Sequence, residues 1–131
     1  MCRLIGNLTI CPPADAQFAA VAAFTDDSTA ELDLHVERYA RNREVLLTGL
    51  ADLGITRTAP ADGAFYVYAD VSQLTTDSLQ FCSHLLSDTG VAIAPGVDFD
   101  TVRGGASVRL SFAGPTSDID EALRRIGAWL R

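Results

Sequence analysis

Arg109 is the residue whose type and position best suit it to bind a ligand. It stands in the alternating stretch Val108-Arg109-Leu110-Ser111-Phe112, which predicts a strand with one apolar face. The arginine lies on the other face of that strand, where a permanently charged guanidinium can grip a carboxylate through two parallel hydrogen bonds. The same spacing also fits a charge that faces solvent or an ion pair with a nearby aspartate.

A turn that contains Gly63 leads into an aromatic stretch and is a second candidate. In Gly63-Ala64-Phe65-Tyr66 the glycine precedes a predicted strand whose alternate residues are apolar. Aromatic side chains at this place suit the wall of a small-molecule site. An ordinary turn before a core strand produces the same pattern, so the spacing leaves both interpretations open.

The other reactive residue types form no pattern that predicts a catalytic or metal site. Asp98-Phe99-Asp100 offers too few ligands for a calcium loop. His35 and His84 lie on different predicted helices, without a second ligand at metal-binding spacing. All ten basic residues are arginine, so no lysine amine is available to form a Schiff base.

Composition narrows the class of protein. The 131 residues are 48% hydrophobic and 21% charged, which is typical of one globular domain with a small core. The net charge of −7 argues against binding to nucleic acid or to an anionic membrane surface, and charged residues interrupt every apolar run well before the roughly 20 residues of a membrane span. The three cysteines lack CxxC spacing and residues 1–13 lack a signal-peptide pattern, so we expect reduced thiols and a cytoplasmic location.

The scaffold that must position these residues is predicted to be of the α+β class. After an irregular segment over residues 1–13, apolar periodicity predicts helices over residues 14–24, 28–53, 76–88 and 116–130. Alternation predicts strands over residues 55–59, 64–71, 91–94 and 106–113. We therefore expect a single domain with a mixed or antiparallel sheet of three or four strands that helices cover.

The predicted helices carry signals for their ends and for their buried faces. Ser28 and Glu31 have the spacing of a capping box, and Gly54 is expected just after the end of the longest helix. The apolar stripe of that helix comprises Leu32, Val36, Tyr39, Leu46, Leu50 and Leu53. The helix over residues 76–88 is expected to bury Leu79, Cys82, Leu85 and Leu86, and the helix over residues 116–130 to bury Ile119, Leu123, Ile126 and Leu130.

Four segments occur together in the order and spacing of one known family. They are Asn7-Leu8-Thr9-Ile10-Cys11-Pro12-Pro13 with Gln17, Asp62-Gly63-Ala64-Phe65-Tyr66-Val67, Gly90-Val91-Ala92-Ile93-Ala94-Pro95-Gly96 with Phe99, and Val108-Arg109-Leu110-Ser111-Phe112-Ala113. Together they resemble the C-terminal part of the class I/II aminotransferases, which are fold type I enzymes that use pyridoxal phosphate (PLP). The resemblance extends from about residue 7 to residue 130.

The resemblance implies a fold, a reaction and roles for four residues. Residues 1–131 would form the small C-terminal domain, with residues 1–13 coming from the domain boundary. Arg109 would bind the α-carboxylate of the substrate, Phe65 and Gly63 would stand near the substrate, and Asn7 would stand near the domain boundary. The complete enzyme would pass an amino group between an amino acid and a 2-oxo acid through PLP.

The resemblance also implies that the residues that anchor PLP lie in a large domain that is absent here. The chain would then be a truncated frame, a cleavage product or a deliberate fragment. We expect it to be inactive alone, to bind no PLP covalently, and to self-associate through the helix over residues 14–24 and the N-terminal segment. The alternative is a non-catalytic module that binds amino acids or oligomerises, similar in outline to ACT-like regulatory domains.

Overall fold

The computed structural model describes residues 11–131, so Asn7 lies outside the described residues. The chain divides between residues 37 and 38 into two compact units. None of the helices in the described part is both long and apolar enough to cross a membrane.

The first unit contains α2 (Ala14–Ala22) and the first turns of α3 (Asp26–Asp52). No residue of α2 is buried, and the apolar side chains of Phe18, Val21 and Phe24 are 80%, 68% and 86% exposed. The described residues of this unit therefore have no apolar core of their own.

The start of α3 differs from the predicted capping box. The side-chain oxygen of Thr25 accepts the backbone N–H of Ser28 at 3.3 Å, which is the bond that an N-cap residue makes with the third helical residue. Thr25 thus takes the place expected for Ser28, and the helix begins at Asp26. The prediction that Ser28 and Glu31 form a capping box was wrong, because a hydroxyl with the same chemistry stands three residues earlier.

The end of α3 is where the sequence predicts it. Gly54 has a left-handed backbone with φ of +79°, and its N–H donates to the carbonyl of Ala51 at 2.9 Å. The N–H of Ile55 donates to the carbonyl of Leu50 at 2.8 Å, and the two apolar side chains join the same core. This pair of bonds is a Schellman motif, which favours glycine at the left-handed position.

Only the later part of the α3 stripe is buried. Leu46 and Leu50 belong to the core, whereas Leu32 and Val36 are 57% and 62% exposed. The stripe predicted from the spacing is therefore buried only in its later part. Helical spacing shows which residues share a face, but it does not show whether another element covers that face.

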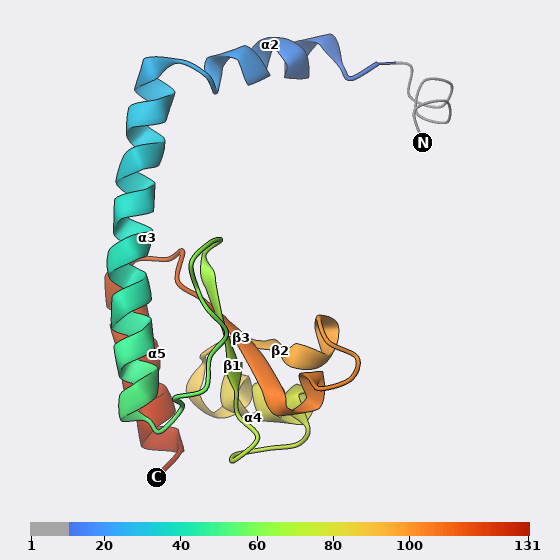
Figure 1. The fold of residues 1–131 in the computed structure, drawn as a ribbon, viewed down its shortest axis with the longest axis vertical. Coiled ribbons are helices and arrows are strands. Elements are labelled where there is room, and N and C mark those ends of the chain that lie inside the picture. The colour runs from blue at the N-terminus through green and yellow to red at the C-terminus, as the bar shows by residue number, and fades with distance from the viewer. Residues whose placement is uncertain (1–10) are drawn as a thin grey trace. The chain divides into compact units, whose positions relative to one another are not determined.

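The second unit is built on a three-stranded antiparallel sheet in the order β1-β3-β2 (Figure 1). The strands are β1 (Tyr66–Asp70), β2 (Ala94–Pro95) and β3 (Ser107–Ser111). Arg109 lies in the middle of the central strand, opposite Tyr68 of β1 and Ala94 of β2. The alternation of residues 106–113 therefore predicted the position of Arg109 correctly.

The expected strand over residues 55–59 is reduced to a short pairing along the free edge of β1. Thr58 forms a single bridge with Ala69, the N–H of Ala59 donates to the carbonyl of Tyr68, and the carbonyl of Arg57 accepts from Asp70. Pro60 follows at once and has no N–H to continue the ladder. The sheet proper consequently has three strands.

Helices cover one face of the sheet, and the core lies between them. α4 (Ser78–Thr89) and α5 (Thr116–Trp129) pack with the later part of α3 against the apolar side chains of the strands. The buried apolar residues of the strands are Val67, Ala69, Val108 and Leu110. The opposite face of the sheet carries Tyr66, Tyr68 and Arg109.

The buried stripe of α4 is narrower than predicted. Ser78, Cys82 and Leu85 are buried, but Leu79 and Leu86 are exposed. The buried residues are four and three positions apart, so they form a single stripe along one side of the helix. The expectation that Leu79 and Leu86 are buried was wrong, because no described element covers the adjacent side of the helix, where these two residues lie.

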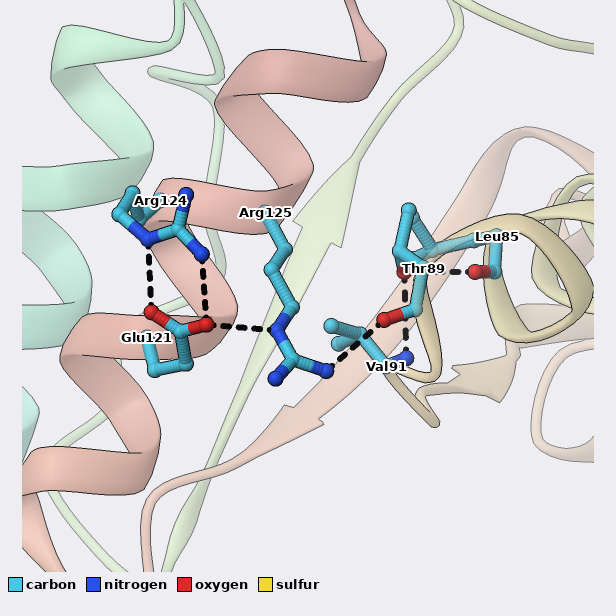
Figure 2. A network of polar contacts seen from close by, with 6 residues as sticks. All are labelled: Leu85, Thr89, Val91, Glu121, Arg124 and Arg125. Atoms are coloured by element: carbon cyan, nitrogen blue, oxygen red, sulfur yellow. Dashed lines mark hydrogen bonds and ion pairs between the residues drawn. The ribbon is translucent and has the colours of Figure 1, made fainter.

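α5 is fixed to its neighbours by close packing and by charge. A Cβ at Gly127 would lie 2.8 Å from the Leu53 side chain, so the glycine lets the two helices approach. On the α4 side, Glu121 accepts hydrogen bonds from Arg124 and Arg125, and Arg125 also donates to the carbonyl of Thr89 at 3.0 Å (Figure 2). This network connects α5 to the C-terminal end of α4. As predicted, α5 buries Ile119 and Ile126 and packs Leu123 and Leu130 against the core.

Candidate functional site

The guanidinium of Arg109 lies against two aromatic rings on the open face of the sheet. Its central carbon is 4.1 Å from the ring centroid of Phe99 and 5.1 Å from that of Tyr66. Such distances allow cation–π attraction at both rings. Tyr66 comes from the neighbouring strand, whereas Phe99 comes from the loop between β2 and β3.

These residues line a pocket of about 290 Å³ that combines one guanidinium, one carboxylate and aromatic side chains. Its walls are Tyr66, Tyr68, Phe99, Asp100 and Arg109. Within residues 11–131, no carboxylate lies within 4.0 Å of the Arg109 guanidinium. The interpretation of Arg109 as one half of an internal ion pair is therefore not supported by the described residues, and its charge is available to a ligand.

A larger hollow of about 790 Å³ adjoins this pocket, and Tyr68 and Asp100 line both. Two of its charges are paired, since Arg57 contacts Asp70 at 2.6 Å, and Arg103 also lines it. Hydrogen bonds from Ser72 lower the pKa of Asp70, and Arg57 lowers it further. The smaller pocket is the better candidate because its guanidinium lies against two aromatic rings.

The loop that carries Phe99 is held by its own polar and backbone contacts. The carboxylate of Asp100 accepts the backbone N–H groups of Arg103 and Val102 at 3.0 and 2.8 Å, and these bonds lower the pKa of Asp100. The short 3-10 helices η1 (Gly96–Asp98) and η2 (Gly104–Ala106) touch at their first glycines. A Cβ at Gly104 would overlap the backbone of Gly96, so the loop closes only with glycine there.

Asn42 holds the far end of β3. Its side chain is completely buried, and its amide donates to the carbonyls of Phe112 and Gly114 at 2.9 and 2.8 Å. Its oxygen accepts the hydroxyl of Thr116 at 2.6 Å. One side chain of α3 therefore fixes the end of the strand that carries Arg109 and the start of α5.

Phe65 and Gly63, the other sequence-predicted site residues within residues 11–131, are not among the residues that line the pocket. Phe65 is half exposed, and its ring packs edge-to-face on Tyr66 with the centroids 6.1 Å apart. Phe65 is thus connected to Arg109 through Tyr66. Gly63 is exposed, and a Cβ there would meet open space. The left-handed residue of this turn is Ala64, with φ of +57°, rather than the glycine.

Sequence reasoning placed Tyr66 in a candidate aromatic wall and quoted Phe99 with one family segment, but it assigned neither residue to the site. Tyr68 was not selected, although alternation places it with Tyr66 on the face of β1 that lies on the same side of the sheet as Arg109. Asp100 had no signal, because it lies in a loop without periodicity.

Nearly the whole chain matches one protein family. The model of the class I and II aminotransferases covers residues 2–126 of the 131. The chain belongs to this family. The resemblance carried by the four sequence segments is thereby confirmed.

Curated aminotransferases align with nearly all of this aminotransferase chain. The valine–pyruvate aminotransferase of Mycobacterium tuberculosis is 68% identical over 97% of the chain and 33% of its own length. The aspartate/prephenate aminotransferase of Thermus thermophilus is 36% identical over 95% of the chain and 32% of its own length. This aminotransferase chain thus spans about a third of the length of these curated relatives.

Solved aminotransferases share the fold. A crystal structure of an aminotransferase from Mycobacterium tuberculosis superposes with a TM-score of 0.94 at 68% identity, over 97% of this chain and 33% of that one. The aspartate aminotransferase from Thermus thermophilus with maleate superposes with a TM-score of 0.82 at 35% identity, over 96% and 32%. The predicted α+β fold of an aminotransferase small domain is confirmed.

The residues of this aminotransferase chain do not fit the covalent attachment of PLP, the cofactor of the family. That attachment is a Schiff base with a lysine, and the sequence contains no lysine. In the part of the chain that the structure describes, no group of three or more His, Cys, Asp or Glu side chains is arranged to hold a metal ion.

Proposed function

We propose that this chain is the small domain of a PLP-dependent aminotransferase and that Arg109 binds the carboxylate of the amino acid or 2-oxo acid substrate. The observation that carries the proposal is the guanidinium of Arg109, which has no carboxylate partner among the described residues and lines a pocket with aromatic walls. Two parallel hydrogen bonds from a guanidinium match the geometry of a carboxylate.

The names of the relatives agree with a carboxylate ligand. Valine and pyruvate each carry one carboxylate, and the aspartate and prephenate in the name of the Thermus thermophilus relative each carry two. Maleate, with which the related aspartate aminotransferase was solved, is a dicarboxylate. In this proposal Phe65 and Gly63 stand near the substrate, and Asn7 stands near the domain boundary.

The proposal assigns binding to these 131 residues and the PLP chemistry to residues elsewhere. A chain without lysine cannot anchor the cofactor through a side-chain amine. We therefore expect this chain to catalyse no transamination alone. PLP followed by borohydride reduction should label no side chain; mapped reduction at any residue other than the N-terminal amine would contradict this expectation.

The binding role can be tested by titrating the full chain with pyruvate, valine and maleate by NMR. Arg109→Ala should abolish the shifts that the ligands cause in the pocket. Arg57→Ala is the matched control, because it removes the same charge from the adjoining hollow and leaves Arg109 in place. Binding that survives Arg109→Ala, or no binding by the unaltered chain, would contradict the proposed role.

The same titration tests the alternative of a non-catalytic module. Tight binding of one amino acid without PLP, lost in Arg109→Ala, would favour a module that senses that amino acid. Weak binding of many carboxylates through Arg109 would favour the interpretation that this chain supplies one part of an enzyme's substrate site.

A further inference from the structure

We propose that Phe99 and Tyr66 are positioning residues, which hold the guanidinium of Arg109 in the orientation that receives a carboxylate. The inference rests on the proposed role of Arg109 as the carboxylate-binding residue. It assigns a task to two aromatic side chains that are 51% and 38% exposed.

Aromatic rings, and no described carboxylate, contact the guanidinium of Arg109. Its central carbon lies over the Phe99 ring at 4.1 Å and near the Tyr66 ring at 5.1 Å. A ring face attracts the cation yet takes no conventional hydrogen bond from it. The N–H donors of the guanidinium therefore stay free for a ligand, and the full positive charge is kept.

The same contacts reduce the conformational entropy that the Arg109 side chain loses when a ligand binds. An arginine side chain in water samples many rotamers, and a ligand must stop that motion when it binds. The Phe99 ring restricts the guanidinium before the ligand arrives. Carboxylate binding then needs less ordering of the protein, which is how preorganisation raises affinity.

The surroundings of each ring explain how an exposed aromatic side chain stays in place. Phe99 precedes Asp100, whose carboxylate ties the loop through the N–H groups of Val102 and Arg103. Tyr66 is fixed by strand pairing with Ser111 and by the edge-to-face contact with Phe65. The two rings thus approach Arg109 from a tied loop and from a paired strand.

Phe99→Leu tests the inference, because it keeps an apolar side chain of similar size and removes the aromatic face. We expect the dissociation constant for pyruvate or maleate to rise about three- to tenfold, which is the scale of one cation–π contact. Tyr66→Leu should act in the same direction. Phe99→Tyr keeps an aromatic ring and should bind with the affinity of the unaltered chain. Phe18→Leu, a change in the first unit, should also leave the dissociation constant unchanged.

A second measurement needs no ligand. In the NMR spectrum of the arginine side chains, the Nε–H signal of Arg109 should be displaced by the Phe99 ring, and rotation about its Nε–Cζ bond should be slow. Phe99→Leu should move the signal toward those of free arginines and speed the rotation. A signal of Arg109 that is already that of a free arginine in the unaltered chain would overturn the inference.

The outcomes separate this inference from the proposed function. If Arg109→Ala abolishes binding and Phe99→Leu leaves both the dissociation constant and the Nε–H signal unchanged, positioning by Phe99 is wrong and the role of Arg109 stands. If Arg109→Ala leaves binding unchanged, the proposed function fails. A circular dichroism spectrum of each variant identifies any loss of fold. If Phe99→Leu does not fold, the comparison of Phe99→Tyr, which keeps an aromatic ring, with the unaltered chain tests the inference instead.

Discussion

The side-chain amide of Asn42 donates a hydrogen bond of 2.9 Å to the backbone carbonyl of Phe112, and both partners are buried. The two residues are 70 positions apart in the chain. This bond ties α3 to the strand that presents Arg109, so the orientation of the candidate site depends on a residue from another element.

Asn42→Ala should strongly destabilise the second unit. It leaves the carbonyls of Phe112 and Gly114 and the hydroxyl of Thr116 without their partner, and buried unsatisfied polar groups are costly. We expect a loss of about 2–4 kcal/mol in the free energy of unfolding, measured with urea. Thr116→Val removes one of the three bonds and should cost about 1 kcal/mol. Equal losses in the two variants would contradict the central role of Asn42.

Gly104→Ala should disturb the loop that carries Phe99. The added methyl group would overlap the backbone of Gly96, and overpacking of this kind costs about 1–3 kcal/mol. Urea unfolding should show this loss, and the NMR titration should show weaker carboxylate binding as Phe99 moves. Gly114→Ala is the control, because a Cβ there meets open space. Unchanged binding in Gly104→Ala would show that the loop tolerates the shift.

Stability should fall in acid partly through Glu121. Hydrogen bonds from Arg124 and then from Arg125 lower the pKa of this carboxyl from 4.5 to about 2. A carboxyl whose pKa is lower in the folded state stabilises that state above its unfolded pKa, and this contribution is lost as the pH falls toward the folded value. Between pH 4.5 and 2 the urea midpoint of the unaltered chain should therefore fall more than that of Glu121→Gln. Parallel pH curves would show that the charge of Glu121 in the network of Figure 2 contributes nothing to folding.

The chain should self-associate through its first unit. Exposed apolar patches favour association, and α2 leaves Phe18, Val21 and Phe24 exposed. Light scattering should show a mass that rises with concentration, and Phe18→Ser combined with Phe24→Ser should lower it. Val102→Ser is the control, because Val102 is equally exposed but lies in the second unit. A strict monomer at all concentrations would contradict the prediction.

The sequence predicted those features of the fold that depend on the backbone conformation of a few neighbouring residues. Gly54 ends α3 because a left-handed residue is needed there, and Arg109 faces away from the core because strand alternation has a period of two. Such features depend on backbone geometry within a few residues, so the sequence displays them directly.

Features that depend on distant partners were harder to predict. Leu32 and Val36 continue an apolar stripe that no described element covers, and Asn42 interrupts the same stripe at a position whose partners lie 70 or more residues away. Phe99 reaches Arg109 only because its loop folds back over the sheet. Periodicity carries no information on these contacts, although a polar residue within an apolar stripe is a sign of a buried bond.

The register of β3 against β1 determines which face of the sheet carries Arg109. Side chains alternate across a strand, so a slip of one residue against β1 would turn Arg109 into the apolar interior and Val108 and Leu110 outward. A bound carboxylate would then be released, and mass action would in turn favour the correct alignment whenever ligand is present. Ligand concentration would thereby select against mispaired conformers.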